Sequence, residues 1–127
     1  MPTPIDIKEF LKLSETHPIL DVRTPAEFDQ GHVPRALNLP IFTNEERAII
    51  GTLYKKEGKQ PAVLKALEIV GPKLYEYVQE AIKVNKNETF LVHCWRGGMR
   101  SSSMAWFLET YGFKCLTLKG GYKSYRK

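Results

Sequence analysis

The chain alternates between short apolar runs and longer stretches in which apolar residues recur every three to four positions. The short runs are typical of buried strands, and the longer spacing is typical of helices that cover a sheet. Strands are expected at residues 18–23, 36–39, 89–93 and 115–118. Helices are expected at residues 7–14, 25–30, 43–57, 61–84 and 101–111. This alternation predicts an α/β domain with a parallel sheet, helices on both faces and a site at the carboxyl ends of the strands.

Capping patterns support two of the expected helix starts. Asp6 with Glu9, and Thr43 with Glu46, have the spacing of a capping box, in which the two residues satisfy N–H groups that the first turn leaves unbonded. Such patterns make the helix starts more specific than apolar spacing alone.

The helical pattern of residues 61–84 is the longest in the chain. Gly71-Pro72 should kink or split it, because proline cannot donate to the helical hydrogen-bond ladder. The apolar residues of this segment are spaced for one face of a helix: Leu64, Leu67, Val70, Leu74, Tyr77, Val78, Ala81 and Ile82. In the preceding helix Gly51 costs about 1 kcal/mol relative to alanine, which predicts close packing at that position.

Length and composition indicate one globular domain. The 127 residues are 43% hydrophobic and 26% charged, which excludes disordered and fibrous classes. The excess of 19 Lys and Arg over 14 Asp and Glu gives a net charge of +5, which suits an anionic substrate or a nucleic acid. We expect a cytoplasmic protein without a membrane partner, because no apolar run approaches the roughly 20 residues of a membrane span and the first residues do not resemble a signal peptide.

The two cysteines limit any cysteine chemistry of this chain to that of a single thiol. Cys94 and Cys115 are too few for a disulfide framework or a four-cysteine zinc site, and no cluster in the sequence suggests a metal or a bound cofactor. Cys115 lies in an apolar strand run and is expected to be an inert core thiol. Cys94 instead stands between a strand and a helix, where a reactive residue is expected.

The loop from Cys94 to Arg100 carries the candidate chemistry. Two glycines permit a tight turn with inward N–H groups, and the following helix adds its positive end, so the loop predicts an anion site. The same field favours a thiolate, the nucleophilic form of cysteine. Arg96 and Arg100 offer guanidinium donors to a tetrahedral oxyanion. We therefore expect Cys94 to be catalytic, with anion or substrate contacts from Trp95, Arg96, Gly97, Gly98, Met99 and Arg100.

Trp95 and Met99 have two interpretations, since either side chain could pack on the core or offer an apolar wall to a substrate. Around the loop, His93 and His32 are expected to be structural. An ion pair between Arg23 and Glu27 is expected to hold a strand to the next helix.

Several motifs along the chain resemble the rhodanese superfamily. They are Asp21-Val22-Arg23, Glu27-Phe28, Gly31-His32-Val33-Pro34-Arg35-Ala36, the loop from Cys94 to Arg100, and Gly120-Gly121-Tyr122. The resemblance covers nearly the whole chain. It implies a single rhodanese-like domain over residues 1–127, with a parallel sheet of about five strands. It also implies a cysteine that carries sulfur or selenium as a persulfide or perselenide.

The length of the cysteine loop leaves an alternative open. Cys94 through Arg100 spans seven residues, whereas ordinary sulfurtransferases of the superfamily have six; the longer spacing resembles cysteine-dependent phosphatases and arsenate reductases of the same fold. Phosphoryl transfer through cysteine usually requires a placed acid, and the five residues between Cys94 and Arg100 contain no carboxylate. An Asp or Glu elsewhere in the chain could still serve.

Residues 94–103, 46–58 and 118–127 resemble the rhodanese domain of the tRNA 2-selenouridine synthase family, including a helical insert at about 41–87. Members convert wobble 2-thiouridine of tRNA to 2-selenouridine with selenophosphate, through an S-geranylated intermediate. The resemblance implies that Cys94 handles selenium, that its loop holds selenophosphate as co-substrate, and that tRNA is a partner.

Full-length members of that family continue into a P-loop domain that binds geranyl diphosphate and tRNA, and this sequence contains no Gly-x4-Gly-Lys-Ser/Thr motif. We therefore expect an excised domain or one half of a split enzyme, with a P-loop domain or subunit as partner. The insert is either the docking surface for that partner or a helical cap on the sheet. A third function is a non-enzymatic module that binds anions or tRNA through the cysteine loop.

Overall fold

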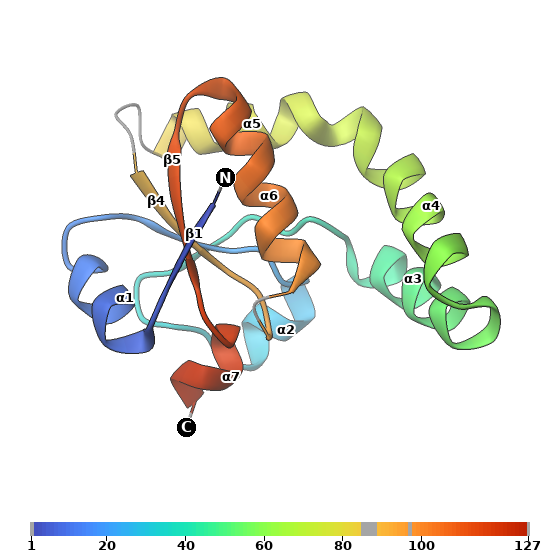
Figure 1. The fold of residues 1–127 in the computed structure, drawn as a ribbon, viewed down its shortest axis with the longest axis horizontal. Helices are drawn as coiled ribbons and strands as arrows, with labels where there is room; N and C mark the ends of the chain where they lie inside the picture. The colour runs from blue at the N-terminus through green and yellow to red at the C-terminus, as the bar shows by residue number, and fades with distance from the viewer. Residues whose placement is uncertain (1, 85–88, 97, 127) are drawn as a thin grey trace.

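A parallel sheet runs through the centre of the molecule (Figure 1). The structure is a computed structural model, and it describes residues 2–84, 89–96 and 98–126. Within these residues five strands pair in the order β1-β5-β4-β2-β3, all parallel. Their bounds are Thr3–Ile5 for β1, Ile19–Asp21 for β2, Leu37–Asn38 for β3, Thr89–His93 for β4 and Lys114–Leu118 for β5. The predicted fold class is thus confirmed.

Helices cover both faces of the sheet. They are α1 (Ile7–Leu13), α2 (Pro25–Gln30), α3 (Asn44–Glu57), α4 (Lys59–Val70), α5 (Leu74–Val84), α6 (Met99–Tyr111) and α7 (Gly121–Arg126). Buried residues of α5 and α6, such as Tyr77 and Met104, pack with Leu20 and Phe90 on one face. Phe10 of α1 and Tyr122 of α7 pack with Ile19 and Leu91 on the other. None of the described helices is long and apolar enough to cross a membrane.

The capping residues act as the sequence predicts. The Asp6 side chain accepts a hydrogen bond from the Glu9 N–H at 2.9 Å, and Thr43 with Glu46 forms a complete capping box. Gly58, with a φ of 97°, then ends α3 in a backbone conformation that a residue with a Cβ rarely adopts. These contacts confirm the expected helix starts.

Two elements were not predicted. The strand β1 is only three residues long and contains Pro4, which lowers any strand signal; it is tolerated because β1 is at the sheet edge, paired to β5 alone. The helix α7 contains Gly121 and few apolar residues, so its spacing is weak. In addition, α6 begins at Met99, two residues before the predicted start.

The helices α3 and α4 form a hairpin, residues 44–70, that extends away from the sheet (Figure 1). A 3-10 turn at Gly71–Lys73 separates α4 from α5, which confirms the split expected at Gly71-Pro72. An ion pair of 2.6 Å between Lys73 and Glu46 ties the hairpin to this turn. The hairpin is thus held mainly at its base, while its outer part projects from the domain.

The hairpin packs less closely than its sequence suggests. Leu64 and Leu67 belong to the predicted apolar face of residues 61–84, yet they are 70% and 61% exposed, because α4 lies beyond the edge of the sheet (Figure 1). Close packing was expected at Gly51, but a Cβ there would meet nothing nearer than Arg47 Nη1 at 3.9 Å. Helical spacing thus predicted the helices correctly, but it did not predict which of their side chains other elements bury.

Candidate functional site

Cys94 lies directly after β4, at the carboxyl edge of the sheet, where α/β proteins place their sites. Its side chain is buried, and its thiol donates to Ser101 Oγ at 3.2 Å. Ser101 is in the first turn of α6, and its hydroxyl donates to the Gly98 carbonyl at 3.2 Å. The Cys94 sulfur therefore lies at the N-terminal end of a 13-residue helix, where the helix dipole favours negative charge.

The C-terminal helix α7 holds the start of the cysteine loop. The backbone N–H of Tyr122 donates to the Cys94 carbonyl at 2.7 Å, and that of Lys123 donates to the Trp95 carbonyl at 2.9 Å. Gly120, with a φ of 77°, turns the chain from β5 into this helix, and a Cβ there would lie 3.0 Å from Ser124 Cβ. The motif Gly120-Gly121-Tyr122 thus positions α7 so that its backbone binds the cysteine loop, a role that the sequence analysis did not predict.

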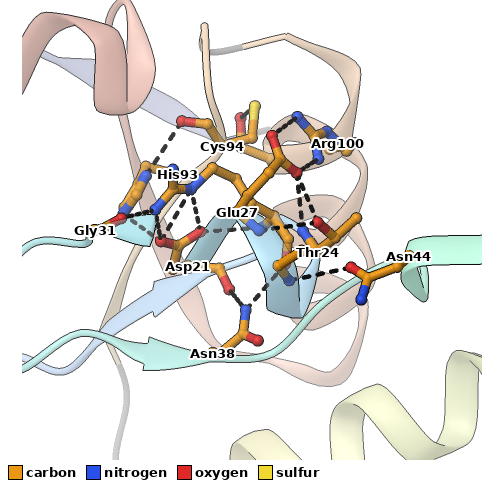
Figure 2. Close-up of polar contacts among 12 residues, drawn as sticks. Asp21, Thr24, Glu27, Gly31, Asn38, Asn44, His93, Cys94 and Arg100 are labelled. Atoms are coloured by element: carbon orange, nitrogen blue, oxygen red, sulfur yellow. Dashed lines mark hydrogen bonds and ion pairs between the residues drawn. The ribbon is translucent and has the colours of Figure 1, made fainter. Parts of the chain in front are cut away.

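A buried network braces the loop from below (Figure 2). The guanidinium of Arg23 donates to the Asp21 carboxylate, with the shortest contact at 2.7 Å, and also to the Gly31 carbonyl at 2.8 Å. His93 Nε2 lies 3.6 Å from the same carboxylate, and Nδ1 lies 3.2 Å from the Cys94 carbonyl oxygen. These contacts support the structural role expected for His93, and they show that Asp21 braces the end of β2.

The environment of His93 keeps its ring neutral. Burial lowers its pKa, and the nearby Asp21 carboxylate raises it only in part. The ring also packs edge-on against Phe10 and is stacked with Tyr122, at centroid distances of 6.1 Å in both cases. The neutral His93 ring therefore packs between the sheet and α7 and has a structural role.

The prediction of an ion pair between Arg23 and Glu27 was wrong. Arg23 turns to Asp21, and Glu27 instead accepts from Arg100, at 2.7 Å to Nη1 and 3.4 Å to Nη2 (Figure 2). Burial alone would raise the pKa of Glu27, but hydrogen bonds from Arg100 and Thr24 lower it to about 2. The contact joins α2 to α6 across 73 residues of sequence, which a local pattern cannot reveal.

Arg100 is therefore already held by a carboxylate at the mouth of the loop. The contact fixes the direction of its guanidinium, which has five N–H donors and uses two of them on Glu27. Arg96, in contrast, is exposed. The two arginines offered by the sequence thus differ in how firmly they are oriented.

A cavity of about 650 Å³ opens between the cysteine loop and the α3–α4 hairpin. The predicted site residues line it together: Cys94, Trp95, Arg96, Gly98, Met99 and Arg100. Gly97 lies outside the described residues. The opposite wall is formed by the hairpin, so the insert contributes directly to the site.

Arg47 of α3 is a site residue that the sequence analysis did not single out. It lines the cavity, and the protein around it lowers its pKa by excluding water, with a further lowering by the positive charge of Arg100. The negative charges of Glu27 and Cys94 raise the pKa of Arg47, but by less than burial and Arg100 lower it. The one available signal was its place in the insert, one turn after the Thr43 cap. Arg47 and Arg100 thus approach each other from separate helices and concentrate positive charge near the thiol.

The described lining of the cavity contains no Asp, Glu or His side chain. Glu27, which reaches Arg100, is ionised at neutral pH because its pKa is about 2, so it holds no proton for a leaving group. No group of three or more potential metal ligands occurs among the residues that could be searched. The other cysteine, Cys115, is buried in β5, and burial raises its pKa to about 12, which agrees with an inert core thiol.

Comparisons with known proteins match residues 6–127 to the family described as the rhodanese-like domain. Curated relatives include proteins named tRNA 2-selenouridine synthase. The protein from Psychromonas ingrahamii is 37% identical over 87% of this chain and 30% of its own length. The one from Proteus mirabilis is 38% identical over 91% of this chain and 32% of its own length. The chain thus spans about a third of the length of these relatives.

Solved structures extend the match to the fold. The N-terminal domain of a putative ATP/GTP binding protein from Clostridium difficile has a TM-score of 0.90 and 38% identity, covering 98% of this chain and 96% of that one. A rhodanese-related protein from Thermoplasma volcanium has a TM-score of 0.61 at 18% identity, over 98% and 90% of the two chains, and supports the fold alone.

Proposed function

Because the chain belongs to the family of rhodanese-like domains, we propose that it transfers sulfur or selenium through Cys94 in the conversion of tRNA wobble 2-thiouridine to 2-selenouridine. The observation that carries the proposal is the position of the Cys94 thiol, at the positive end of α6 in a cavity that also receives Arg47, Arg96 and Arg100. A thiolate there is a nucleophile beside a binding site for an oxyanion.

With thiosulfate as donor, the Cys94 thiolate attacks the outer sulfur. A new S–S bond forms on Cys94, the S–S bond of thiosulfate breaks, and sulfite leaves with the electron pair. With selenophosphate, water attacks phosphorus and breaks the P–Se bond, so that phosphate leaves. The selenide set free attacks the inner sulfur of the Cys94 persulfide, so an S–Se bond forms, the S–S bond breaks and hydrosulfide leaves. The arginines would bind the oxygens of either leaving group and so stabilise the charge that develops on it.

The remaining partners belong to the same proposal. The relatives named tRNA 2-selenouridine synthase are about three times as long as this chain, so a P-loop unit that holds geranyl diphosphate and makes further contacts with tRNA is assigned to sequence outside it. The basic excess of +5 favours contact with tRNA phosphates. In this arrangement the present chain supplies the chalcogen step.

The test is to incubate the protein separately with selenophosphate, thiosulfate and an aryl phosphate, and to identify by mass spectrometry what is attached to Cys94. We expect a persulfide from thiosulfate and, when selenophosphate is added to this persulfide form, selenium on Cys94, recognised by its isotope pattern. Cys94→Ser should abolish both adducts, and Cys115→Ser should retain them. Unmodified Cys94 with both donors would contradict the proposal.

A phosphatase or arsenate reductase has the loop spacing in its favour, and the absence of a protonated carboxylate along the described cavity wall against it. Phosphate attached to Cys94, with selenide released, or steady turnover of the aryl phosphate, would support that function instead. A purely binding module would keep salt-sensitive tRNA binding in Cys94→Ser and show no adduct in the wild type.

A further inference from the structure

Arg47 lines the cavity from the hairpin side, across from the loop that carries Cys94 and Arg100. It makes no ion pair in the part of the chain that the structure describes, whereas Arg100 is held by Glu27 at 2.7 Å. The positive charge of Arg100 lowers the pKa of Arg47, and the charge of Cys94 raises it, so the three groups sense one another across the cavity. An anion between the two arginines would be attracted by both and would offset their mutual repulsion.

Gly51 leaves space beside the Arg47 guanidinium. It lies one turn after Arg47 in α3, and a Cβ at this position would be 3.9 Å from Arg47 Nη1. Helical side chains lean toward the N-terminus of their helix, so a long side chain at position 51 would extend over the Arg47 side chain. An alanine there would only touch the guanidinium, whereas a leucine would occupy its space. Arg47 therefore has room to turn its guanidinium toward a ligand in the cavity.

A tetrahedral oxyanion has oxygens for more than one side of the cavity. When the outer sulfur of thiosulfate points to the Cys94 thiol, the oxygens on the inner sulfur point away from the thiol in different directions. Arg100, fixed by Glu27, would bind oxygen from the loop side, and Arg47 would bind another from the hairpin side. A thiosulfonate carries a carbon in place of one oxygen and has one negative charge less, so it has less to offer a second guanidinium.

We propose that Arg47 is a specificity-determining residue of the Cys94 site, which binds an oxygen of the donor from the hairpin side and so selects donors with a dianionic tetrahedral oxyanion. The inference rests on the proposed function for the transfer to Cys94, and it adds the residue that discriminates among donors. It also gives the helical insert a role, because α3 supplies a charge on a side of the cavity that the cysteine loop does not reach. An anion bound from both sides would join the hairpin to the loop.

Thiosulfate and methanethiosulfonate form a matched pair of donors. The Cys94 thiolate attacks the outer sulfur of either one, an S–S bond forms on Cys94, the S–S bond of the donor breaks, and sulfite or methanesulfinate leaves with the electron pair. Arg47→Gln should lower the rate constant for persulfide formation about fivefold to tenfold with thiosulfate, and less than about twofold with methanethiosulfonate. Mass spectrometry of Cys94 over time measures both rate constants. Equal effects on the two donors, or none, would overturn the inference, because a merely structural role of Arg47 would not distinguish them.

Two further variants separate a direct contact from the general charge of the helix. Lys56→Gln removes the same charge from α3, but Lys56 does not line the cavity, so the preference for thiosulfate should stay at the wild-type value. Arg47→Lys should keep part of the preference, because the charge remains while the planar fork of donors is lost. A loss of preference in Lys56→Gln as large as in Arg47→Gln would overturn the contact.

The space at Gly51 offers a test that removes no charge. Gly51→Leu should lower the preference for thiosulfate about threefold, because leucine crowds the guanidinium of Arg47, whereas Gly51→Ala should keep it. A loss of equal size in both variants would count against the inference, since an alanine Cβ makes only an ordinary contact with Arg47.

Hydrogen exchange tests whether a bound anion joins the hairpin to the loop. Inorganic phosphate, compared with chloride at the same ionic strength, should slow exchange of the amides in residues 44–57 about fivefold in the wild type and leave Arg47→Gln unchanged. No slowing in the wild type, or the same slowing in both proteins, would overturn the inference. The two proposals fail separately. Persulfide formation that is independent of Arg47 removes only this inference, and an Arg47-dependent effect of phosphate without any persulfide or selenium adduct removes only chalcogen transfer.

Discussion

The cysteine loop is held by contacts from several directions, whereas the α3–α4 hairpin across the cavity presents apolar side chains to water. Beneath the loop, Asp21, Arg23 and His93 form a network with almost no solvent exposure, and α7 bonds the first two loop carbonyls. On the hairpin, Leu64 and Tyr54 are both more than half exposed. The loop has the rigidity that a nucleophile needs, and the hairpin has surface left for a ligand or partner.

This contrast predicts an uneven distribution of stability. Segments with few buried contacts open locally at a small cost in free energy, whereas a region tied into the main core opens only with global unfolding. The base of the hairpin is fixed by Val70 and by the Lys73–Glu46 ion pair. Substitutions around the loop should therefore affect the whole domain, and substitutions along the hairpin should affect the cavity with little effect on the fold.

The largest loss is expected for Asp21→Asn. The substitution removes the negative charge from a buried pair and leaves Arg23 without its ionic partner, which should cost about 3–5 kcal/mol in free energy of unfolding. Lys65→Met breaks the exposed pair with Glu68 on the hairpin and should cost at most about 0.5 kcal/mol. Denaturant titration of both variants measures the difference, and similar losses would contradict the contrast.

The next effect compares two helical leucines. Leu108 of α6 is fully buried against the sheet, and truncation to alanine should cost about 2–5 kcal/mol through lost burial and the cavity left behind. Leu64→Ala on α4 should change the free energy of unfolding by less than about 0.5 kcal/mol, because water already covers that side chain. Thermal and denaturant unfolding of both variants measures the two losses in free energy of unfolding. Losses of similar size would contradict the contrast between the core and the hairpin.

Leu64 also marks a limit of the sequence analysis. Spacing predicted the helix correctly, and local signals such as the Thr43 capping box and Gly71-Pro72 predicted where helices start and split. Burial of a helix face, however, depends on the element that packs against it, and α4 lies beyond the sheet. The sequence therefore predicted where helices start and split, but it did not predict which helix faces other elements cover.

The candidate site follows the same rule. The loop around Cys94 could be identified because strand, glycines, arginines and helix are consecutive in the sequence. The partners of the loop could not: Glu27 reaches Arg100 from 73 residues away, and Arg47 comes from the insert. The motif Gly120-Gly121 was noted, but its helix was not predicted, because six residues with few apolar side chains give little periodicity.

The contact between Glu27 and Arg100 should give a pH-dependent effect. Folding lowers the Glu27 pKa from 4.5 to about 2, so its contribution to stability is complete above pH 4.5 and is lost as the pH falls toward 2. Glu27→Gln should therefore cost about 1–2 kcal/mol at neutral pH, a value reduced because solvent screens this partly exposed pair. The cost should shrink between about pH 4.5 and 2.

Denaturant titrations from pH 7 to pH 3 check this dependence. Glu80→Gln is the matched control, because Glu80 pairs with Lys83 on an exposed helix face and should show almost no change at any pH. A cost for Glu27→Gln that is constant with pH would show that the carboxylate charge is not what Arg100 requires.

The smallest effects are expected at two glycines, and they should have opposite signs. Gly120→Ala places a Cβ 3.0 Å from Ser124 Cβ at a φ of 77°, so it should destabilise the turn into α7 by about 1 kcal/mol or more. Gly51→Ala meets only Arg47 Nη1 at 3.9 Å inside a regular helix, so it should stabilise by about 0.5–1 kcal/mol through helix propensity. Melting temperatures of the two variants should therefore move in opposite directions. A loss at Gly51 would mean that the hairpin is packed more tightly than its exposed leucines indicate, and the contrast between the two walls of the cavity would then need revision.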